Sequence, residues 1–320
     1  MRTFLRHLAV FSILPALAVL AILLKLDGRT DERYLRYTTP PQTSLILGSS
    51  RAAIGLRPHV LDSVLGAEGH DIHSYNFSFA IGFSSYGPAY YGTISRKLDP
   101  TARNGVFILS VDPWTISCRK DKPPSNDRAE DATSSIGHVR SVSADPNIDY
   151  LLNIYDHPLL TILLPDQRPK EYAARVGDDG LLEMEVSMQP AEVERRTIRK
   201  VKEYREDRLP LARPSALRLG YLGLTIDLLK EHGTVVLVRM PVSSGIQAVE
   251  DRLMPGFSAT MARMADERQV RFIDLYNAPD EWTFIDGDHL TASSGRKATA
   301  MIANDLLHPP GPAMDGSKTR

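Results

Sequence analysis

The sequence predicts an α/β protein, a three-layer α/β/α sandwich around a mainly parallel sheet of about five strands, preceded by an N-terminal transmembrane helix. Three observations predict this class. Five short apolar runs are typical of buried strands. Apolar residues at helical spacing lie between the early runs and again between the late runs, and an uncharged apolar stretch opens the chain. The five strand-like runs cover residues 43–47, 72–79, 105–111, 234–239 and 270–275.

The composition fits a globular protein and argues against several other classes. The chain has 320 residues, of which 42% are hydrophobic, and a formal net charge of −1. A chain of this size can bury one large core or two modest ones, and its balanced charge indicates no nucleic-acid partner. The single cysteine, Cys118, excludes an intramolecular disulfide and a cysteine-based zinc site, and we expect it to be a small, partly buried apolar residue. No motif indicates a cofactor.

Residues 1–25 are predicted to be a membrane anchor or signal sequence. Two arginines and a histidine precede an uncharged apolar run over residues 8–24, and Lys25 follows where a small-residue cleavage site would lie. We favour an uncleaved anchor over a signal peptide or a buried core helix. The basic end should stay in the cytoplasm, which makes this a single-pass inner-membrane protein with its soluble domain in the periplasm or outside the cell.

A charged stretch over residues 26–42 ends in two threonines and two prolines, as expected of a juxtamembrane linker. The predicted domain covers residues 43–307, and residues 308–320 are expected to form a flexible tail. The first strand ends in Gly48-Ser49-Ser50-Arg51, and helical spacing follows from Pro58. Reactive side chains gather at the carboxyl edge of parallel sheets, so Ser50 is a candidate nucleophile. Gly-Ser-Ser is also common in ordinary loops.

The middle of the chain continues and then interrupts this pattern. After the second strand a helix is expected over residues 88–98, and the third strand is followed by Asp112-Pro113-Trp114. Strand and helix signals then lapse, and residues 118–208 are interpreted as an insertion or cap. Within it, residues 119–147 are expected to be a long surface loop or partly disordered, and residues 172–186 a hairpin.

The α/β pattern resumes with a helix that begins after the N-cap Ser215 and ends at Gly233. Residues 246–269 are mostly helical, with a break near Pro255-Gly256, and lie between the last two strands. A final helix is expected after Ser293 or Ser294 as its cap.

The motif Asp286-Gly-Asp288-His289 lies in the loop before that final helix. A carboxylate three residues before a histidine can fold back to accept the Nδ1 proton, which leaves Nε2 free to act as a base. Asp288 is the alternative partner, although adjacent side chains normally point apart. The other interpretations are a solvated loop histidine and a metal site built from both aspartates and His289, for which no further histidine lies at ligand spacing.

A serine after the first strand, together with D-x-x-H before the last helix, resembles the SGNH (GDSL-type) hydrolase superfamily. The resemblance covers roughly residues 43–112 and 215–307 and implies a flavodoxin-like sandwich. It implies that Ser50 is the nucleophile, His289 the general base and Asp286 the residue that orients it. It also implies an oxyanion hole from the backbone amides of Ser50 and Gly82, where Gly82 could equally be an ordinary turn glycine.

Two departures from the family pattern concern the site. Ser49 stands where the family has an aspartate that helps to hold the loop. Asp112 stands where the third block normally supplies an asparagine to the oxyanion hole. An ionised Asp112 would repel an oxyanion, so a structural role is favoured for it. Asn76 is a candidate replacement donor, although at the end of a strand it could equally be structural.

The chain also resembles membrane-tethered proteins of cell-envelope polymer acylation, which have Gly-Ser-Ser-Arg in the first block and D-x-x-H-L in the last. This resemblance implies an extracytoplasmic serine esterase or O-acyltransferase acting on an acylated, O-acetylated envelope or exported polysaccharide, or on small acyl esters. Other envelope acylation proteins would be partners, and Arg51 would contact a polymer carboxylate or phosphate, although exposed arginines are usually only solvated. The alternative is a catalytically silent protein of the same fold that binds polysaccharide or scaffolds an envelope complex.

Overall fold

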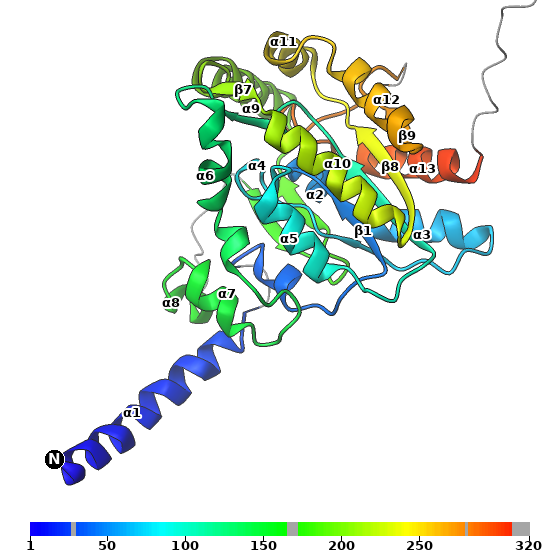
Figure 1. Cartoon of the computed structure of the whole chain (residues 1–320). Coiled ribbons are helices and arrows are strands. Elements are labelled where there is room, and N and C mark those ends of the chain that lie inside the picture. The colour runs from blue at the N-terminus through cyan, green and yellow to red at the C-terminus, as the bar shows by residue number, and fades with distance from the viewer. Residues whose placement is uncertain (27–29, 165–171, 279–280, 309–320) are drawn as a thin grey trace, which may run out of the picture.

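Five parallel strands form the central sheet in the computed structural model, which describes residues 1–26, 30–164, 172–278 and 281–308 (Figure 1). Their order is β2-β1-β3-β8-β9, with bounds Ser74–Asn76, Ser44–Leu47, Gly105–Ser110, Gly233–Arg239 and Arg271–Asp274. The chain moves from β1 to one neighbour and then returns to the other side, so the topological switch point lies between β1 and β3. The predicted fold class is confirmed.

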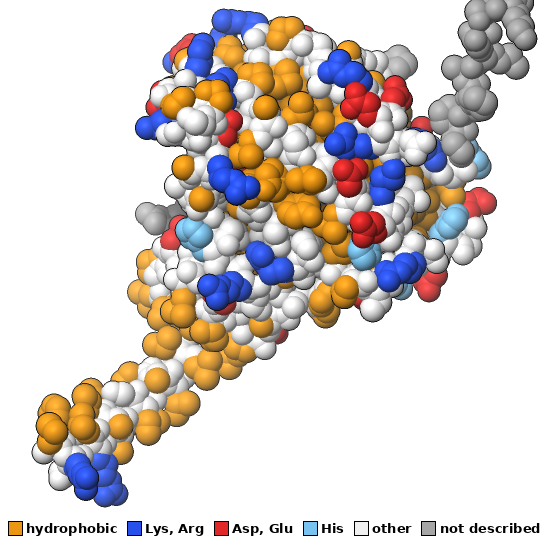
Figure 2. All heavy atoms as spheres, in the orientation of Figure 1, with side chains coloured by type: hydrophobic (Ala, Val, Ile, Leu, Met, Phe, Trp, Pro, Cys, Tyr) orange, Lys and Arg blue, Asp and Glu red, His pale blue; other side chains and the backbone are white. Residues whose placement is uncertain are grey.

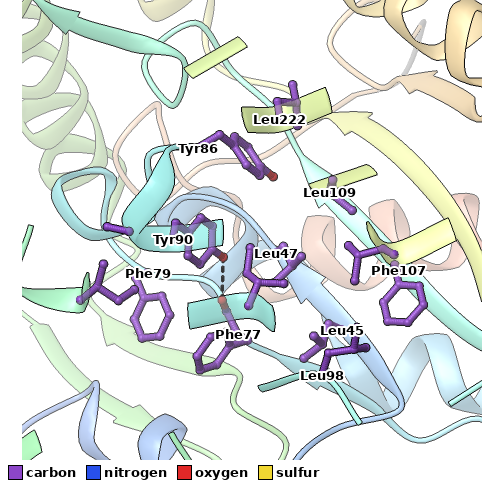
Figure 3. Packing of buried hydrophobic residues seen from close by; sticks show 14 of the residues in the cluster. Leu45, Leu47, Phe77, Phe79, Tyr86, Tyr90, Leu98, Phe107, Leu109 and Leu222 are labelled. Carbon is purple, nitrogen blue, oxygen red and sulfur yellow. Dashed lines mark hydrogen bonds between the residues drawn. The ribbon is translucent and has the colours of Figure 1, made fainter. Parts of the chain in front are cut away.

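Strand residues alternate between two apolar layers because successive side chains point to opposite faces of the sheet. Leu45 and Leu47 of β1 pack with α5 (Pro88–Lys97), α10 (Ala216–Lys230) and α12 (Phe257–Arg268). Figure 3 shows part of this layer, where Tyr90 also donates a hydrogen bond to the Phe77 carbonyl at 2.8 Å. Ile46 packs in the opposite layer, which contains α3 (Pro58–Ala67) and α13 (Ala292–Leu307).

The elements outside the insertion follow the predicted ones with small differences. The predicted second strand is shortened to Ser74–Asn76, and the break near residue 255 separates α11 (Ser244–Leu253) from α12. The cap of α13 is Thr291, whose side chain accepts the Ser294 amide, and not Ser293 or Ser294. The short helices beside the strand ends are α2 (Ser50–Gly55) and α4 (Ile81–Ser84).

The insertion over residues 118–208 is largely regular structure. Its two ends meet where β4 (Ser117–Arg119) pairs antiparallel with β7 (Ala212–Pro214). The predicted hairpin is confirmed as β5 (Tyr172–Val176) against β6 (Leu182–Val186). The other elements in or bordering it are η2 (Pro124–Asn126), α6 (Asp127–Ala132), η3 (Ser135–His138), α7 (Ile148–Asn153), α8 (Leu160–Leu163), α9 (Pro190–Lys202), η4 (Glu203–Arg208) and η5 (Leu209–Leu211).

The expectation of a loop or disorder is therefore wrong for residues 124–138, most of which form η2, α6 and η3, whereas residues 120–123 and 139–147 form no helix or strand. Asp127 accepts hydrogen bonds from Ser215 and Arg213, and Asp131 accepts the Ala89 amide at 2.8 Å. Ile136 and Val139 are buried in the core layer of α5. Hydrogen bonds to the buried Asp127 and Asp131 hold this segment in place. Its apolar residues are too few to show the periodicity of a helix or strand in the sequence. Cys118 is buried, as expected.

Residues 30–42, in the stretch predicted to be a juxtamembrane linker, pack against the domain. The short helix η1 (Tyr34–Tyr37) buries both of its tyrosines, and Asp31 accepts a hydrogen bond from Tyr150 at 2.6 Å. The buried Arg36 donates to the carbonyls of Asn76 and Gly180. Residues 27–29 of the expected linker, and the expected tail beyond residue 308, lie outside the described residues.

The helix α1 (Arg2–Leu23) projects from the domain and none of its residues is buried (Figure 1). It has 22 residues with a mean hydropathy of 2.0, which makes it long and apolar enough to cross a membrane or to serve as a signal sequence.

Candidate active site

Ser50 stands at the carboxyl end of β1, as the first residue of α2, beside the topological switch point. Gly48 makes this turn possible. Its φ is +140°, and a Cβ there would lie 2.7 Å from Cβ of Ser110 on the neighbouring strand. The close approach of β1 and β3 at this point therefore requires glycine. The turn leaves the Ser50 side chain only partly buried.

His289 and Asp286 come from the tight loop between β9 and α13. The loop is closed by a bridge between Phe284 and Leu290 and by the Ile285 amide, which donates to the His289 carbonyl at 2.9 Å. Asp286 Oδ1 accepts the amides of Asp288 and His289 at 3.0 and 2.9 Å. These bonds fold the Asp286 carboxylate back toward the imidazole.

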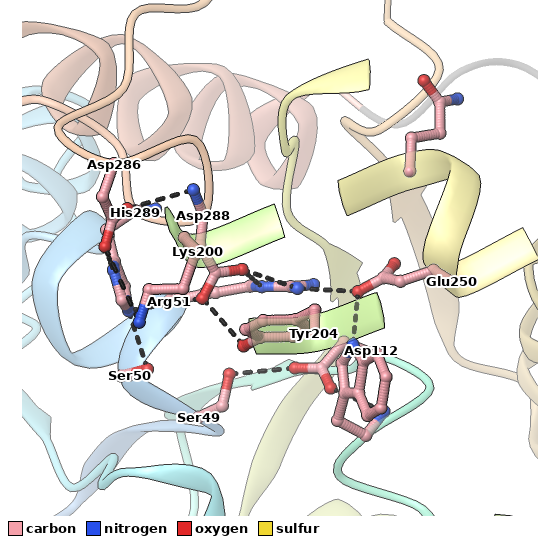
Figure 4. A network of polar contacts seen from close by, with 12 residues as sticks. Ser49, Ser50, Arg51, Asp112, Lys200, Tyr204, Glu250, Asp286, Asp288 and His289 are labelled. Atoms are coloured by element: carbon pink, nitrogen blue, oxygen red, sulfur yellow. Dashed lines mark hydrogen bonds and ion pairs between the residues drawn. The ribbon is translucent and has the colours of Figure 1, made fainter. Parts of the chain in front are cut away.

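The structure brings Ser50, His289 and Asp286 into one hydrogen-bonded line (Figure 4). His289 Nδ1 lies 2.9 Å from Asp286 Oδ2, and His289 Nε2 lies 2.9 Å from Ser50 Oγ. An ionised carboxylate only accepts, so Nδ1 carries the proton and Nε2 is free to accept the serine proton. This is the geometry of a nucleophile, a general base and its orienting group.

The charges around the imidazole favour its protonated form. Burial opposes ionisation of Asp286, but the charge and hydrogen bonds of His289 hold the pKa of its carboxyl well below the usual range. Burial likewise disfavours the imidazolium, but the carboxylates of Asp288 and Asp286 outweigh it and raise the pKa of His289 above 6.5. Asp288 Oδ2 lies 3.6 Å from Nε2, on the side of the ring where the serine proton would arrive.

Asp288 belongs to a buried charge network behind the triad (Figure 4). Arg51 Nε donates to Asp288 Oδ1 at 2.9 Å, and Arg51 Nη2 forms ion pairs of 2.7 Å with both Asp288 and Glu250. Glu250 also receives Arg239 Nη2 at 3.2 Å and the Trp114 indole N–H at 3.1 Å. Burial opposes ionisation of Asp288, but Arg51 keeps the pKa of its carboxyl below the ordinary value.

Arg51 is therefore not placed as a substrate-binding residue. Its side chain is only 3% exposed and its guanidinium faces two carboxylates of the protein. The prediction that it would contact a polymer carboxylate or phosphate is corrected to a structural role. Its partners lie about 200 or more positions away in the sequence, so the Gly-Ser-Ser-Arg motif alone could not reveal them.

Asp112 is also structural. Its Oδ2 accepts the Ser49 hydroxyl at 2.9 Å, and its Oδ1 accepts the amides of Trp114 and Thr115 at 3.0 Å each. Ser49 stands where the resembled family has a carboxylate that holds this loop. Here a carboxylate from the end of β3 holds the serine instead, so the loop keeps a carboxylate contact, whereas the asparagine of the family pattern has no replacement at this position.

The predicted oxyanion-hole donors have different surroundings. Asn76 is fully buried and its Nδ2 donates to the carbonyls of Ala52 and Leu56 at 2.9 Å each, so its amide is already used in the fold. The prediction of Asn76 as a donor is corrected.

The backbone donors lie at helix N-termini. Ser50 is the first residue of α2 and Gly82 is the second residue of α4, where backbone N–H groups have no acceptor within the helix. The Phe79 amide donates to the Gly48 carbonyl at 3.1 Å, which places the approach to α4 beside the Ser50 turn.

The insertion contributes residues that sequence reasoning did not identify. Tyr204 donates to Asp288 Oδ2 at 2.9 Å, Lys200 Nζ lies 4.0 Å from Asp286 Oδ2, and Arg196 donates to the Ile285 carbonyl at 2.8 Å. Pro190 followed by Val193, Thr197, Val201 and Tyr204 at helical spacing is a signal for this helix. No local signal connects it to the Asp286 loop.

Within the described part of the chain, no group of three or more His, Cys, Asp or Glu side chains could hold a metal ion. The two aspartates of the loop serve different partners, Asp286 the imidazole and Asp288 the guanidinium. The arrangement fits acyl transfer by a serine.

No protein-family model and no curated protein sequence matches this chain. Among solved structures, the chain is similar to Est24, a carbohydrate acetylesterase from Sinorhizobium meliloti, with 12% identity over 82% of this chain and 98% of that one and a TM-score of 0.38. It is similar to the aryl esterase of M. smegmatis, with 12% identity over 82% and 98% of the two chains and a TM-score of 0.37. At this level of similarity, inference about function rests on the site itself.

Proposed function

We propose that this protein is an extracytoplasmic serine esterase or O-acyltransferase of SGNH type that acts on acylated cell-envelope or exported polysaccharide. The observation that carries the proposal is the line from Ser50 Oγ through the imidazole to Asp286, with both contacts at 2.9 Å. The three residues come from opposite ends of the sequence and meet at the switch point of the sheet, where α/β proteins bind ligands.

The first half-reaction forms an acyl-enzyme. Ser50 Oγ attacks the ester carbonyl carbon while His289 Nε2 takes the hydroxyl proton, and Asp286 stabilises the imidazolium through Nδ1–H. The carbonyl oxygen becomes an oxyanion, for which the backbone amides of Ser50 and Gly82 are the proposed donors. As the C–O bond breaks, His289 returns the proton to the leaving alcohol. Asp288, at 3.6 Å from Nε2, adds negative charge beside the imidazolium.

The second half-reaction regenerates the serine. His289 takes a proton from water or from a sugar hydroxyl, whose oxygen attacks the acyl carbon, and then returns a proton to Ser50. Water gives hydrolysis and a sugar hydroxyl gives transfer. An O-acetyl group on an envelope polymer is the proposed acyl substrate. The envelope location is supported by a candidate membrane helix that would hold the domain outside the cytoplasm.

Substitution of Ser50 by alanine tests this proposal. Turnover of p-nitrophenyl acetate by the full chain should fall at least about 10³-fold, since the nucleophile is lost. Ser293→Ala, at an exposed serine on α13, is the matched control and should keep its activity. Unchanged turnover in the Ser50 variant would sink the proposal.

A catalytically silent, polysaccharide-binding role is the second candidate. The favouring observation is that Asn76 is used in the fold and Asp112 stands where the resembled family has an asparagine, so the proposed oxyanion donors are backbone amides alone. A silent protein would bind acetylated polysaccharide but would show no turnover that depends on Ser50.

A further inference from the structure

An exposed apolar patch lies on α7 and α8. Beyond residue 24, five of the ten large apolar side chains that are exposed among the described residues fall in this one segment. Each of the five is at least 45% exposed, and Leu152 is 81% exposed. We call them the α7–α8 patch: Ile148, Leu152, Leu160, Leu163 and Leu164. Single exposed leucines are ordinary, whereas a cluster of this kind marks an interaction surface.

The patch lies where α1 leaves the domain. Figure 1 shows α7 and α8 beside the C-terminal end of α1, and α1 contacts α8 directly. Ile22 and Leu23 pack against the domain core, and Leu26 is buried in it. The end of α1 is thus fixed to the domain at the level of the patch.

The length of α1 sets the position of the patch relative to a bilayer. A helix of 22 residues is about 33 Å long, and the hydrocarbon core of a bilayer is about 30 Å thick. A helix that spans this core therefore emerges at the membrane surface at the residues that meet α8. In Figure 2 the apolar surface of α1 continues onto this end of the domain.

We propose that the α7–α8 patch inserts into the surface of the bilayer beside α1, so that the domain is seated on the membrane at two points. The occupant is lipid because the patch is continuous with a helix whose apolar surface is itself unburied. Two points of attachment restrict rotation of the domain about α1 and hold the active site in one orientation toward an envelope polymer. The inference requires α1 to span the membrane, but not that the site is catalytic.

Depth-dependent quenching in proteoliposomes tests the proposal. The full chain is labelled with an environment-sensitive fluorophore at Leu152→Cys or Leu163→Cys, one at a time, and quenching is measured with lipids that carry a nitroxide near the headgroup and, separately, with lipids that carry it near the middle of the acyl chain. Cys118 is buried, and the chain without an added cysteine measures its background labelling. Leu14→Cys in the middle of α1 is the positive control, and Arg263→Cys, 70% exposed on α12, is the negative control.

Labels at positions 152 and 163 should be quenched several-fold more than the label at 263. Equal, weak quenching at 152, 163 and 263 would overturn the proposal, including the case in which a second copy of the chain covers the patch. Absence of quenching at position 14 would mean that α1 does not span the membrane, and this result would also overturn the proposal. None of these outcomes depends on ester hydrolysis, so failure here is distinct from failure of the proposed function.

Discussion

The hydroxyl of Tyr204 donates a hydrogen bond of 2.9 Å to Asp288, the residue adjacent to His289. Tyr204 comes from η4 of the insertion, whereas Asp288 belongs to the loop before the last helix. The insertion is therefore not a separate decoration of the α/β domain, because it forms one wall of the charge network behind the triad. Substitution of Tyr204 should therefore affect the site, although this residue does not contact the reacting atoms.

Tyr204→Phe should destabilise the protein while leaving the aromatic contact with Trp114. The substitution removes a buried donor to a charged carboxylate, which costs about 1.5–3 kcal/mol. Thermal unfolding of the full chain in detergent measures this loss. Tyr91→Phe is the matched control, since among the described residues its hydroxyl makes no hydrogen bond, and its ring contact with Tyr221 would remain. Equal stability of the two variants would contradict the role assigned to Tyr204.

Arg51→Gln should cause a larger loss of stability, since it leaves Asp288 and Glu250 buried without their shared cation. Removing one member of a buried ion pair typically costs about 3–5 kcal/mol. Arg263→Gln, which breaks only an exposed contact with Glu267 at 3.9 Å, should cost less than about 1 kcal/mol. A raised KM for an anionic polymer with unchanged stability would instead restore the substrate-binding role that the sequence first indicated.

The activity should rise with pH through a midpoint above 6.5. His289 must be neutral to accept the serine proton, and the raised pKa of His289 keeps it protonated to higher pH than an ordinary histidine. Asp288→Asn removes a negative charge 3.6 Å from Nε2, so the rising limb should move to lower pH. The pH profile of kcat/KM measures the shift, and Asp266→Asn on the exposed side of α12 should leave it unchanged. A shift to higher pH in the Asp288 variant would contradict this assignment.

Gly48→Ala should damage both the fold and the turn that presents Ser50. An added Cβ meets Ser110 at 2.7 Å in a backbone conformation that L-residues rarely adopt. Gly66→Ala in α3 is the contrasting case, because nothing lies within 4 Å of its added Cβ, and it should stabilise the protein by about 0.4–1 kcal/mol. Chemical denaturation of both variants compares the two glycines, and equal stability would count against the close approach at Gly48.

The sequence was informative where a local pattern carries the structure. The core strands β1, β3 and β8 are apolar runs, and Ser50 and the Asp286–His289 motif are each recognisable within a few residues. Their meeting followed from the rule that parallel strands present their carboxyl ends at one edge. The order of the insertion was missed because Asp127 and Asp131 are held by Arg213, Ser215 and Ala89, far away in sequence.

Partners at long range also explain the misassigned site residues. From the sequence, Arg51 is interpreted as an exposed cation, because its partner Asp288 lies 237 positions later in the chain. The sequence leaves Asn76 open as a donor or as a structural residue, and in the structure its amide donates to the carbonyls of Ala52 in α2 and of the C-cap Leu56. Neither assignment could be made from spacing, because each depends on which side chains the fold brings together.

Labelling with a fluorophosphonate probe, followed by peptide mass spectrometry, measures the activation of Ser50 most directly. We expect one adduct on Ser50 in the wild-type chain, no adduct in Ser50→Ala, and labelling slowed at least about 10²-fold in His289→Ala, where the general base is lost. The proposed mechanism would be contradicted by a wild-type chain that stays unlabelled at Ser50, or by labelling that does not depend on His289.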